Sequence, residues 1–202
     1  MKAIHGPGLS IVSLALLVTA AAAQVTWEDV ASPYDVHRLE RLDEARAKGM
    51  DSAHMDAIER DREAVQDAFR GGVHPISRGA LVGNWHCRTA KTGGILPPIG
   101  YGWFHCRVTE RGGRLFFQKL NGTQRLAGYL YAHRSGGYVL LGGWSVKGEP
   151  MHMYSGNGAS AGAQSSPDDA VALVSAAGSG RVRLEFPFPG QESVYDVMEL
   201  RR

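Results

Sequence analysis

Two stretches decide the fold of this chain: Gly83-Asn84-Trp85-His86-Cys87-Arg88 and Tyr101-Gly102-Trp103-Phe104-His105-Cys106-Arg107. Each contains the tripeptide His-Cys-Arg with a tryptophan upstream, and together they hold both cysteines of the sequence. Both stretches are rich in residues that favour strands, and a Gly/Pro-rich segment connects them. We therefore predict that a disulfide between Cys87 and Cys106 joins the first two strands of an exported β-domain.

The rest of the chain after Gly72 also has the apolar period of two that indicates strands. The expected strands lie near residues 81–89, 101–109, 114–120, 124–132, 138–146, 170–176, 181–186 and 193–200. Double glycines and Asn121-Gly122 separate them as tight turns. About eight short strands joined by hairpins favour an antiparallel up-and-down barrel, because closure removes the exposed edges. A β-sandwich is the main alternative.

Residues 32–69 instead show the period of helices. Ser32 is the expected N-cap of a first helix, and Gly49 is expected to end it. A second helix is expected from Ser52 to the double glycine that follows Phe69. The fold class is therefore mainly β, with an N-terminal α-helical hairpin whose apolar stripe packs on the barrel.

The first residues are typical of a secretory signal peptide, with an apolar stretch, Leu9–Val18, followed by alanines up to Ala23. That apolar stretch is shorter than the roughly 20 residues of a membrane span. We predict a signal peptide at 1–23, a helical hairpin at 24–72 and a β-barrel domain at 73–202. The expected location is periplasmic or secreted.

Charge is distributed unevenly along the chain. The segment from Arg70 to Lys147 holds eleven Lys/Arg and one acidic residue, Glu110. Residues 24–69 hold twelve acidic and six basic residues. We favour acidic helices lying on a basic sheet over a basic face reserved for an anionic partner, because linked segments meet at high effective concentration.

Strand alternation places Cys87 and Cys106 on one face and the adjacent histidines on the other, which argues against a Cys2His2 metal site. The opposite face then gathers His86, Arg88, Trp103, His105 and Arg107. Such a group can contact a carboxylate, phosphate or sugar acid, although a strand face of this kind more often meets water or a covering helix. Zinc on the two histidines would need a third ligand such as His133 or His152, and nothing in the spacing requires one. We expect no metal and no cofactor.

The residues around the possible catalytic motif do not fit the structure that such a motif requires. Gly158-Ala159-Ser160-Ala161-Gly162 matches the nucleophile pattern of serine hydrolases, but no helical period follows it and no histidine follows His152. Asp196 is expected on an inward face, where an arginine such as Arg125 would neutralise it. We assign no catalytic residue and lean against an enzyme.

The stretch Leu81-Val82-Gly83-Asn84-Trp85 resembles the Gly-x-Trp that opens the first strand of lipocalin, avidin and related calycin barrels. The resemblance implies that Trp85 plugs one end of the barrel. It also implies that an arginine from the last strand, Arg201 or Arg202, packs on the indole ring as a cation-π contact.

A second resemblance covers nearly the whole chain after the signal peptide. It rests on the segments 27–30, 35–47, 83–88, 101–107, 115–120, 122–125, 183–187 and 196–200. These segments resemble a family of small secreted bacterial proteins that is described as a domain of unknown function, number 4893. The resemblance supports the predicted boundaries and supplies no activity, cofactor or catalytic residue.

The function we favour is a non-catalytic binding barrel for a small apolar or amphipathic ligand. Its candidate lining is Trp85, Trp103, Trp144 and Tyr129. The alternative is an envelope protein-interaction or inhibitor-like module that uses the basic outer face. We further expect a monomer that does not span the membrane and does not bind nucleic acid.

Overall fold

The computed structural model describes residues 25–56, 58–95, 97–156, 166–190 and 192–202. The predicted signal peptide and the motif around Ser160 lie outside these residues. The helices are α1 (Pro33–Glu40), α2 (Leu42–Asp56), α3 (Glu59–Phe69) and α4 (Arg78–Leu81). Within the described ranges, every helix is too short or too polar to cross a membrane.

The strands follow the helices along the chain. They are β1 (Gly83–Thr92), β2 (Ile99–Gly100), β3 (Phe104–Arg111), β4 (Arg114–Lys119), β5 (Gln124–Ala132), β6 (Tyr138–Val146), β7 (Asp169–Ala176), β8 (Arg181–Pro187) and β9 (Tyr195–Arg201). All neighbouring pairs are antiparallel, in the order β2-β1-β3-β4-β5-β6-β7-β8-β9.

The sheet closes on itself because β1 also pairs with β9, from His86 opposite Arg201 to Thr92 opposite Tyr195. The N-terminal half of β1 pairs with β3 as well, with Trp85 opposite Cys106. The predicted antiparallel barrel is therefore confirmed, and the sandwich alternative is wrong. Short β2 is an additional strand on the edge of β1.

The N-cap prediction for Ser32 is confirmed, because its Oγ accepts a hydrogen bond from the Asp35 amide at 3.1 Å. The predicted helix end at Gly49 is wrong, since α2 continues to Asp56. A Cβ built on Gly49 would lie 2.6 Å from Thr92 Oγ1 and 2.6 Å from Tyr195 Cδ1. This glycine lets α2 approach the barrel wall closely and does not stop the helix.

Three predicted strand starts also differ from the structure. Leu81 belongs to α4, which Ser77 caps by accepting a hydrogen bond from the Ala80 amide at 3.3 Å. Tyr101 precedes β3, because the segment before it pairs with β1 as β2. The last strand starts two residues later than predicted, at Tyr195. Local capping and edge pairing account for the first two differences.

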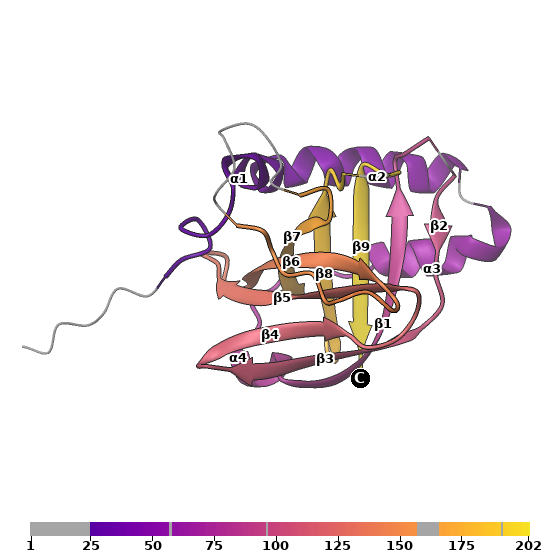
Figure 1. The fold of residues 1–202 in the computed structure, drawn as a ribbon. Helices are drawn as coiled ribbons and strands as arrows, with labels where there is room; N and C mark the ends of the chain where they lie inside the picture. Colours follow the sequence, from indigo (N-terminus) through magenta and orange to yellow (C-terminus); the bar gives the residue numbers. More distant parts are fainter. Residues whose placement is uncertain (1–24, 57, 96, 157–165, 191) are drawn as a thin grey trace, which may run out of the picture.

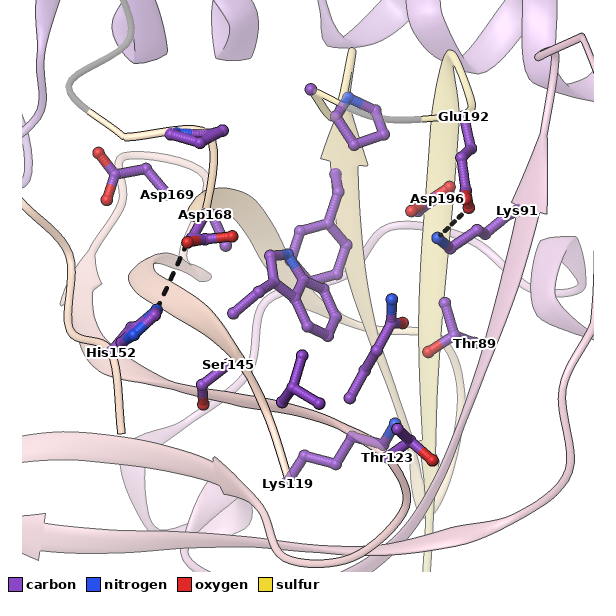
Figure 2. Close-up of a pocket in the computed structure, with 18 of the residues that line it drawn as sticks. Thr89, Lys91, Lys119, Thr123, Ser145, His152, Asp168, Asp169, Glu192 and Asp196 are labelled. Carbon is purple, nitrogen blue, oxygen red and sulfur yellow. Dashed lines mark hydrogen bonds and ion pairs between the residues drawn. The ribbon is translucent and has the colours of Figure 1, made fainter. Parts of the chain in front are cut away.

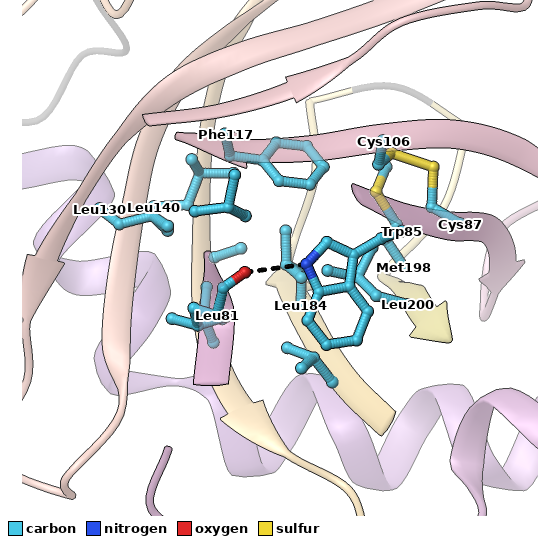
Figure 3. Packing of buried hydrophobic residues seen from close by; sticks show 14 of the residues in the cluster. Leu81, Trp85, Cys87, Cys106, Phe117, Leu130, Leu140, Leu184, Met198 and Leu200 are labelled. Carbon is cyan, nitrogen blue, oxygen red and sulfur yellow. Dashed lines mark hydrogen bonds between the residues drawn. A yellow bond between two sulfur atoms is a disulfide. The ribbon is translucent and has the colours of Figure 1, made fainter. Parts of the chain in front are cut away.

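The barrel interior is filled at one end by apolar side chains around Trp85 and the disulfide (Figure 3). The predicted bond between Cys87 and Cys106 is confirmed, with Cα atoms 5.8 Å apart. Leu184, Met198 and Leu200 pack beside them, and each is at most 1% exposed. This end of the barrel is a solid core, which we call the floor.

The helices lie along the outside of the barrel wall (Figure 1). A second apolar cluster contains residues of these helices and of the strands that they cover. Helices α1, α2 and α3 contact β7, β8, β9 and β1. Leu42 and Val65 of the helices are buried in this cluster with Val171 and Val197 of the strands. Strands β7 to β9 are consequently buried on both faces, which explains their continuous apolar runs.

Candidate functional site

Trp85 closes the barrel at the floor end. Its side chain is buried, and its Nε1 donates a hydrogen bond to the carbonyl oxygen of Leu81 at 2.9 Å. The guanidinium carbon of Arg202 lies 4.4 Å from the centre of the indole ring. Arg202 also donates to the carbonyl oxygens of Ala80 and Val82, both at 2.8 Å. Of the two arginines that the calycin resemblance allows, Arg202 makes the cation-π contact.

A cavity of about 530 Å³ lies around the opposite end of the barrel, which we call the mouth (Figure 2). Residues that line it include Thr89, Lys91, Tyr101, Phe104, Lys119, Gln124, Trp144, Ser145, Glu149, His152, Asp168, Asp169, Phe186, Glu192 and Asp196. They come from most strands of the barrel and from the loops after β6 and β8. The mouth therefore brings together residues that are far apart in the sequence.

Strand alternation explains why these residues face inward. Along β1, Trp85 and Cys87 belong to the floor, and the next residues of the same face are Thr89 and Lys91. On β9, Met198 lies in the floor and Asp196 lines the mouth. The inward face changes from apolar to polar one or two positions beyond the disulfide.

Trp144 and Phe186 form an aromatic wall in the mouth, with ring centres 5.9 Å apart. Trp144 is the one predicted lining residue that borders the cavity. Trp85 belongs to the floor, and Trp103 is 41% exposed on the outer face, where it stacks on Arg88 at 4.5 Å. Tyr129 contacts Phe116 at a centroid distance of 4.9 Å and does not border the cavity.

One side of the mouth is acidic, and its carboxylates have partners. Asp168 lies 3.5 Å from Nδ1 of His152. Asp169 accepts a hydrogen bond from the Ser155 amide at 2.9 Å, and Glu149 accepts one from the Val146 amide at 3.1 Å. These contacts hold the loop after β6 against the barrel.

Asp196 lines the mouth and is buried, at 4% exposure. Burial raises the pKa of its carboxyl to about 7, although the Ser193 hydroxyl donates to it at 2.6 Å. The expected pairing with Arg125 is wrong: the neighbouring cation is Lys91, whose Nζ forms an ion pair with Glu192 at 3.2 Å. Arg125 does not line the cavity, and its positive charge instead lowers the pKa of Lys119.

Lys119 is the inward residue at the end of β4. Its Nζ lies 4.2 Å from the centre of the Phe104 ring, as a cation-π contact. Burial, together with the positive charges of Arg125 and Lys91, lowers the pKa of Lys119 to about 8. The amine is therefore mostly protonated at pH 7.

The predicted cationic face lies outside the barrel and is partly covered by α3. Arg88 is 9% exposed and forms ion pairs with Glu199 at 3.0 Å and with Asp67 of α3 at 2.8 Å. Asp67 also pairs with Arg201 at 3.0 Å. The expected neutralisation of the basic sheet by the acidic helices is thus found at Asp67.

The remaining residues of that face stay accessible. His86 and His105 are exposed and have ring centres 5.3 Å apart, because they are opposite each other on β1 and β3. Arg107 donates to the Asn84 side chain at 2.7 Å. His133 and His152 lie elsewhere, and the described residues contain no group of three or more metal-ligating side chains.

Part of the mouth could be predicted from the alternation of residues along the strands. Continuing the alternation from Cys87 and Cys106 points to Thr89, Lys91 and Phe104 as inward residues. Asp168 and His152 approach the mouth from a long connection between β6 and β7, and no periodic pattern predicts such a contact.

Comparison with known proteins gives a family and no further relatives. A family model described as "Domain of unknown function (DUF4893)" matches residues 27–200. No curated protein and no solved structure matched the chain.

Proposed function

The chain belongs to the DUF4893 family, and from the geometry of its barrel we propose that it is an exported, non-catalytic binding protein that holds a small amphipathic ligand in the mouth. The observation that carries this proposal is the cavity of about 530 Å³ above a closed floor. Binding sites for small molecules usually have volumes of about 300–1,000 Å³. An oxidising compartment outside the cytoplasm fits the disulfide between Cys87 and Cys106.

The floor supports the proposal because its packed side chains limit how deep a ligand can enter the barrel. Phe117, Leu126 and Leu140 pack in the same cluster as Trp85, and each is at most 1% exposed. Packed interiors of this kind leave no room for a ligand. A bound molecule would therefore remain near the rim, with part of its surface in water.

The chemistry of the wall favours an amphipathic molecule. Trp144 and Phe186 offer an apolar aromatic surface, and Phe104 extends the apolar part of the lining. Thr89, Gln124 and Ser145 add neutral hydrogen-bonding groups beside it. Sites for small ligands commonly combine apolar walls with a few polar groups that orient the molecule.

The pair of His152 and Asp168 is the arrangement in the mouth that is closest to a catalytic dyad. Catalysis of the serine-hydrolase type would need a nucleophile within hydrogen-bond reach of the imidazole. Among the described residues, no hydroxyl or thiol has a hydrogen bond to His152. The pair therefore supports ligand contact better than nucleophilic catalysis.

The proposal can be tested with N-phenyl-1-naphthylamine, a neutral aromatic probe whose fluorescence rises in apolar surroundings. We expect the wild-type protein to bind it and Trp144→Ala to weaken binding by about tenfold, since loss of one aromatic contact of about 1.4 kcal/mol has that effect. Trp103→Ala is the matched control, because Trp103 lies outside the cavity. Circular dichroism of each variant checks that it is folded.

Absence of probe binding, or equal binding by the wild type and Trp144→Ala, would contradict the proposal. Equal weakening by both tryptophan variants would also contradict it, because the probe would then bind the surface and not the mouth.

A further inference from the structure

Lys119 differs from the other charged residues of the mouth in its interaction partners. Most of them have a partner within the described residues: Arg38 with Asp35, Lys91 with Glu192, His152 with Asp168, Glu149 with the Val146 amide, Asp169 with Ser155 and Asp196 with Ser193. Lys119 has the face of Phe104 and no carboxylate among those residues. Among the cations of the described lining, Lys119 is the one without a carboxylate partner.

The surroundings of Lys119 increase the cost of leaving it unpaired. The side chain is partly buried, and the charges that act on it, Arg125 and Lys91, are both positive. A cation that loses water contacts without gaining an anion is destabilised. A negatively charged ligand group would remove this penalty.

Asp168 and Asp196, two carboxylates of the mouth, lie away from Lys119. Figure 2 shows Lys119 beside Thr123 at one end of the site, whereas His152 and Asp168 lie on one side and Asp196 lies at the far end. An anionic group is consequently favoured at Lys119 and disfavoured at the opposite end. The site therefore has a positively charged end at Lys119 as well as an apolar wall.

Strand order gives the spacing between the cation and the aromatic wall. Lys119 is on β4 and Trp144 is on β6, and β5 lies between them. Two strand spacings correspond to about 10 Å. A molecule that touches both groups needs an apolar body that extends about that far from its charged end.

We infer that the ligand of the mouth is an amphipathic anion, whose acidic group binds Lys119 and whose apolar body lies against Trp144 and Phe186. This inference rests on the proposed function and adds the ligand class. Carboxylates, phosphates and sulfonates share the chemistry that an ammonium group recognises. Lysine contacts such groups as a point charge, so it specifies the sign of the charge more than its geometry.

Two fluorescent probes with one aromatic skeleton separate the ligand class from the site itself. N-phenyl-1-naphthylamine is neutral, and 8-anilino-1-naphthalenesulfonate carries a sulfonate on the same rings. We expect Lys119→Met to weaken binding of the sulfonate by about tenfold or more, equivalent to about 1.4 kcal/mol, and to leave binding of the neutral probe within about twofold. Retained binding of the neutral probe also shows that the variant is folded.

Two further variants sharpen the comparison. Lys119→Arg keeps a positive charge, so it should retain most of the affinity for the sulfonate. Lys147→Met removes an exposed lysine that immediately follows β6 and does not line the cavity, so it should change neither affinity. The wild type should lose affinity for the sulfonate between pH 7 and pH 9.5, because the pKa of Lys119 is about 8. Lys119→Met should show no such loss.

Binding of both probes with no effect of Lys119→Met would overturn the anion inference and leave the binding barrel in place. Failure of both probes to bind would remove the proposed function and the inference together.

Discussion

The floor and the mouth are two ends of one barrel and are built from the same strands. On β1, the inward residues are Trp85 and Cys87 at the floor and Thr89 and Lys91 at the mouth. The floor contains a disulfide and closely packed apolar groups, and the mouth contains charges and a cavity of about 530 Å³. Alternation along a strand therefore sets which face a residue occupies. Its position along the strand then decides whether an inward residue packs in the core or borders the cavity.

The largest expected difference between the two ends concerns their tryptophans. Trp85→Ala should lower the free energy of unfolding by about 3–5 kcal/mol, because it opens a cavity in a packed core and removes the contact with Arg202. Trp144→Ala should cost about 1–2 kcal/mol, because that ring is only partly buried at the rim of an existing cavity. Urea unfolding followed by circular dichroism measures both values.

Equal losses for the two variants would remove the distinction between a structural floor and an open mouth. Phe117→Ala is a second floor variant, and it should behave like Trp85→Ala, since Phe117 is 1% exposed.

The next effect concerns the disulfide at the floor. Replacing Cys87 and Cys106 together by alanine should lower the free energy of unfolding by roughly 3 kcal/mol in the chain-entropy model, for a loop of this size. The two cysteines are 19 residues apart in the sequence, and both side chains are buried. Unfolding of the oxidised wild type, the reduced wild type and the double variant measures this contribution.

Binding of the neutral naphthylamine should change little in the double variant, because neither cysteine lines the mouth. A variant of normal stability that no longer binds the probe would show that the floor shapes the site directly. That outcome would break the separation between the two ends.

The sequence was sufficient for the barrel because alternation and hairpin turns are local signals. The run from Gln124 to Ala132 and the run from Tyr138 to Val146 match β5 and β6 at both ends. Gly49 shows the limit of such signals. A glycine near the end of a helical pattern usually indicates a stop, but here it removes a clash with Tyr195, more than 100 residues later. A contact over that separation leaves no trace in a local pattern.

The candidate site was harder to predict because sequence position does not say which end of a strand is open. Trp85 and Trp144 are both aromatic and inward, but one belongs to the floor and the other to the mouth. Arg88 and Arg107 share a face, but only Arg88 is covered by Asp67 of α3. The contrast between acidic helices and a basic sheet predicted that the helices neutralise the sheet, but it did not identify Arg88 and Asp67 as the residues that pair.

The third effect concerns Asp196, and its size depends on pH. The pKa of this buried carboxyl is raised from 3.8 to about 7, so the folded protein holds a proton that the unfolded chain releases. The group therefore contributes stability that is present below about pH 4 and is lost as pH rises through 7. Asp196→Asn mimics the neutral carboxyl, so its stability advantage over the wild type should grow as pH rises from 4 to 8, with little difference near pH 4.

Free energies of unfolding at pH 4.5, 6 and 8 measure the divergence of the two proteins. Glu192→Gln is the matched control at the same rim, because its side chain is largely exposed and its ion pair with Lys91 should contribute at most about 1 kcal/mol at any pH. Parallel curves for the wild type and Asp196→Asn would show that Asp196 is not a source of instability. Divergence between about pH 4 and pH 7 would show that the mouth retains a buried charge at a cost in stability, which is common at binding sites and absent from the floor.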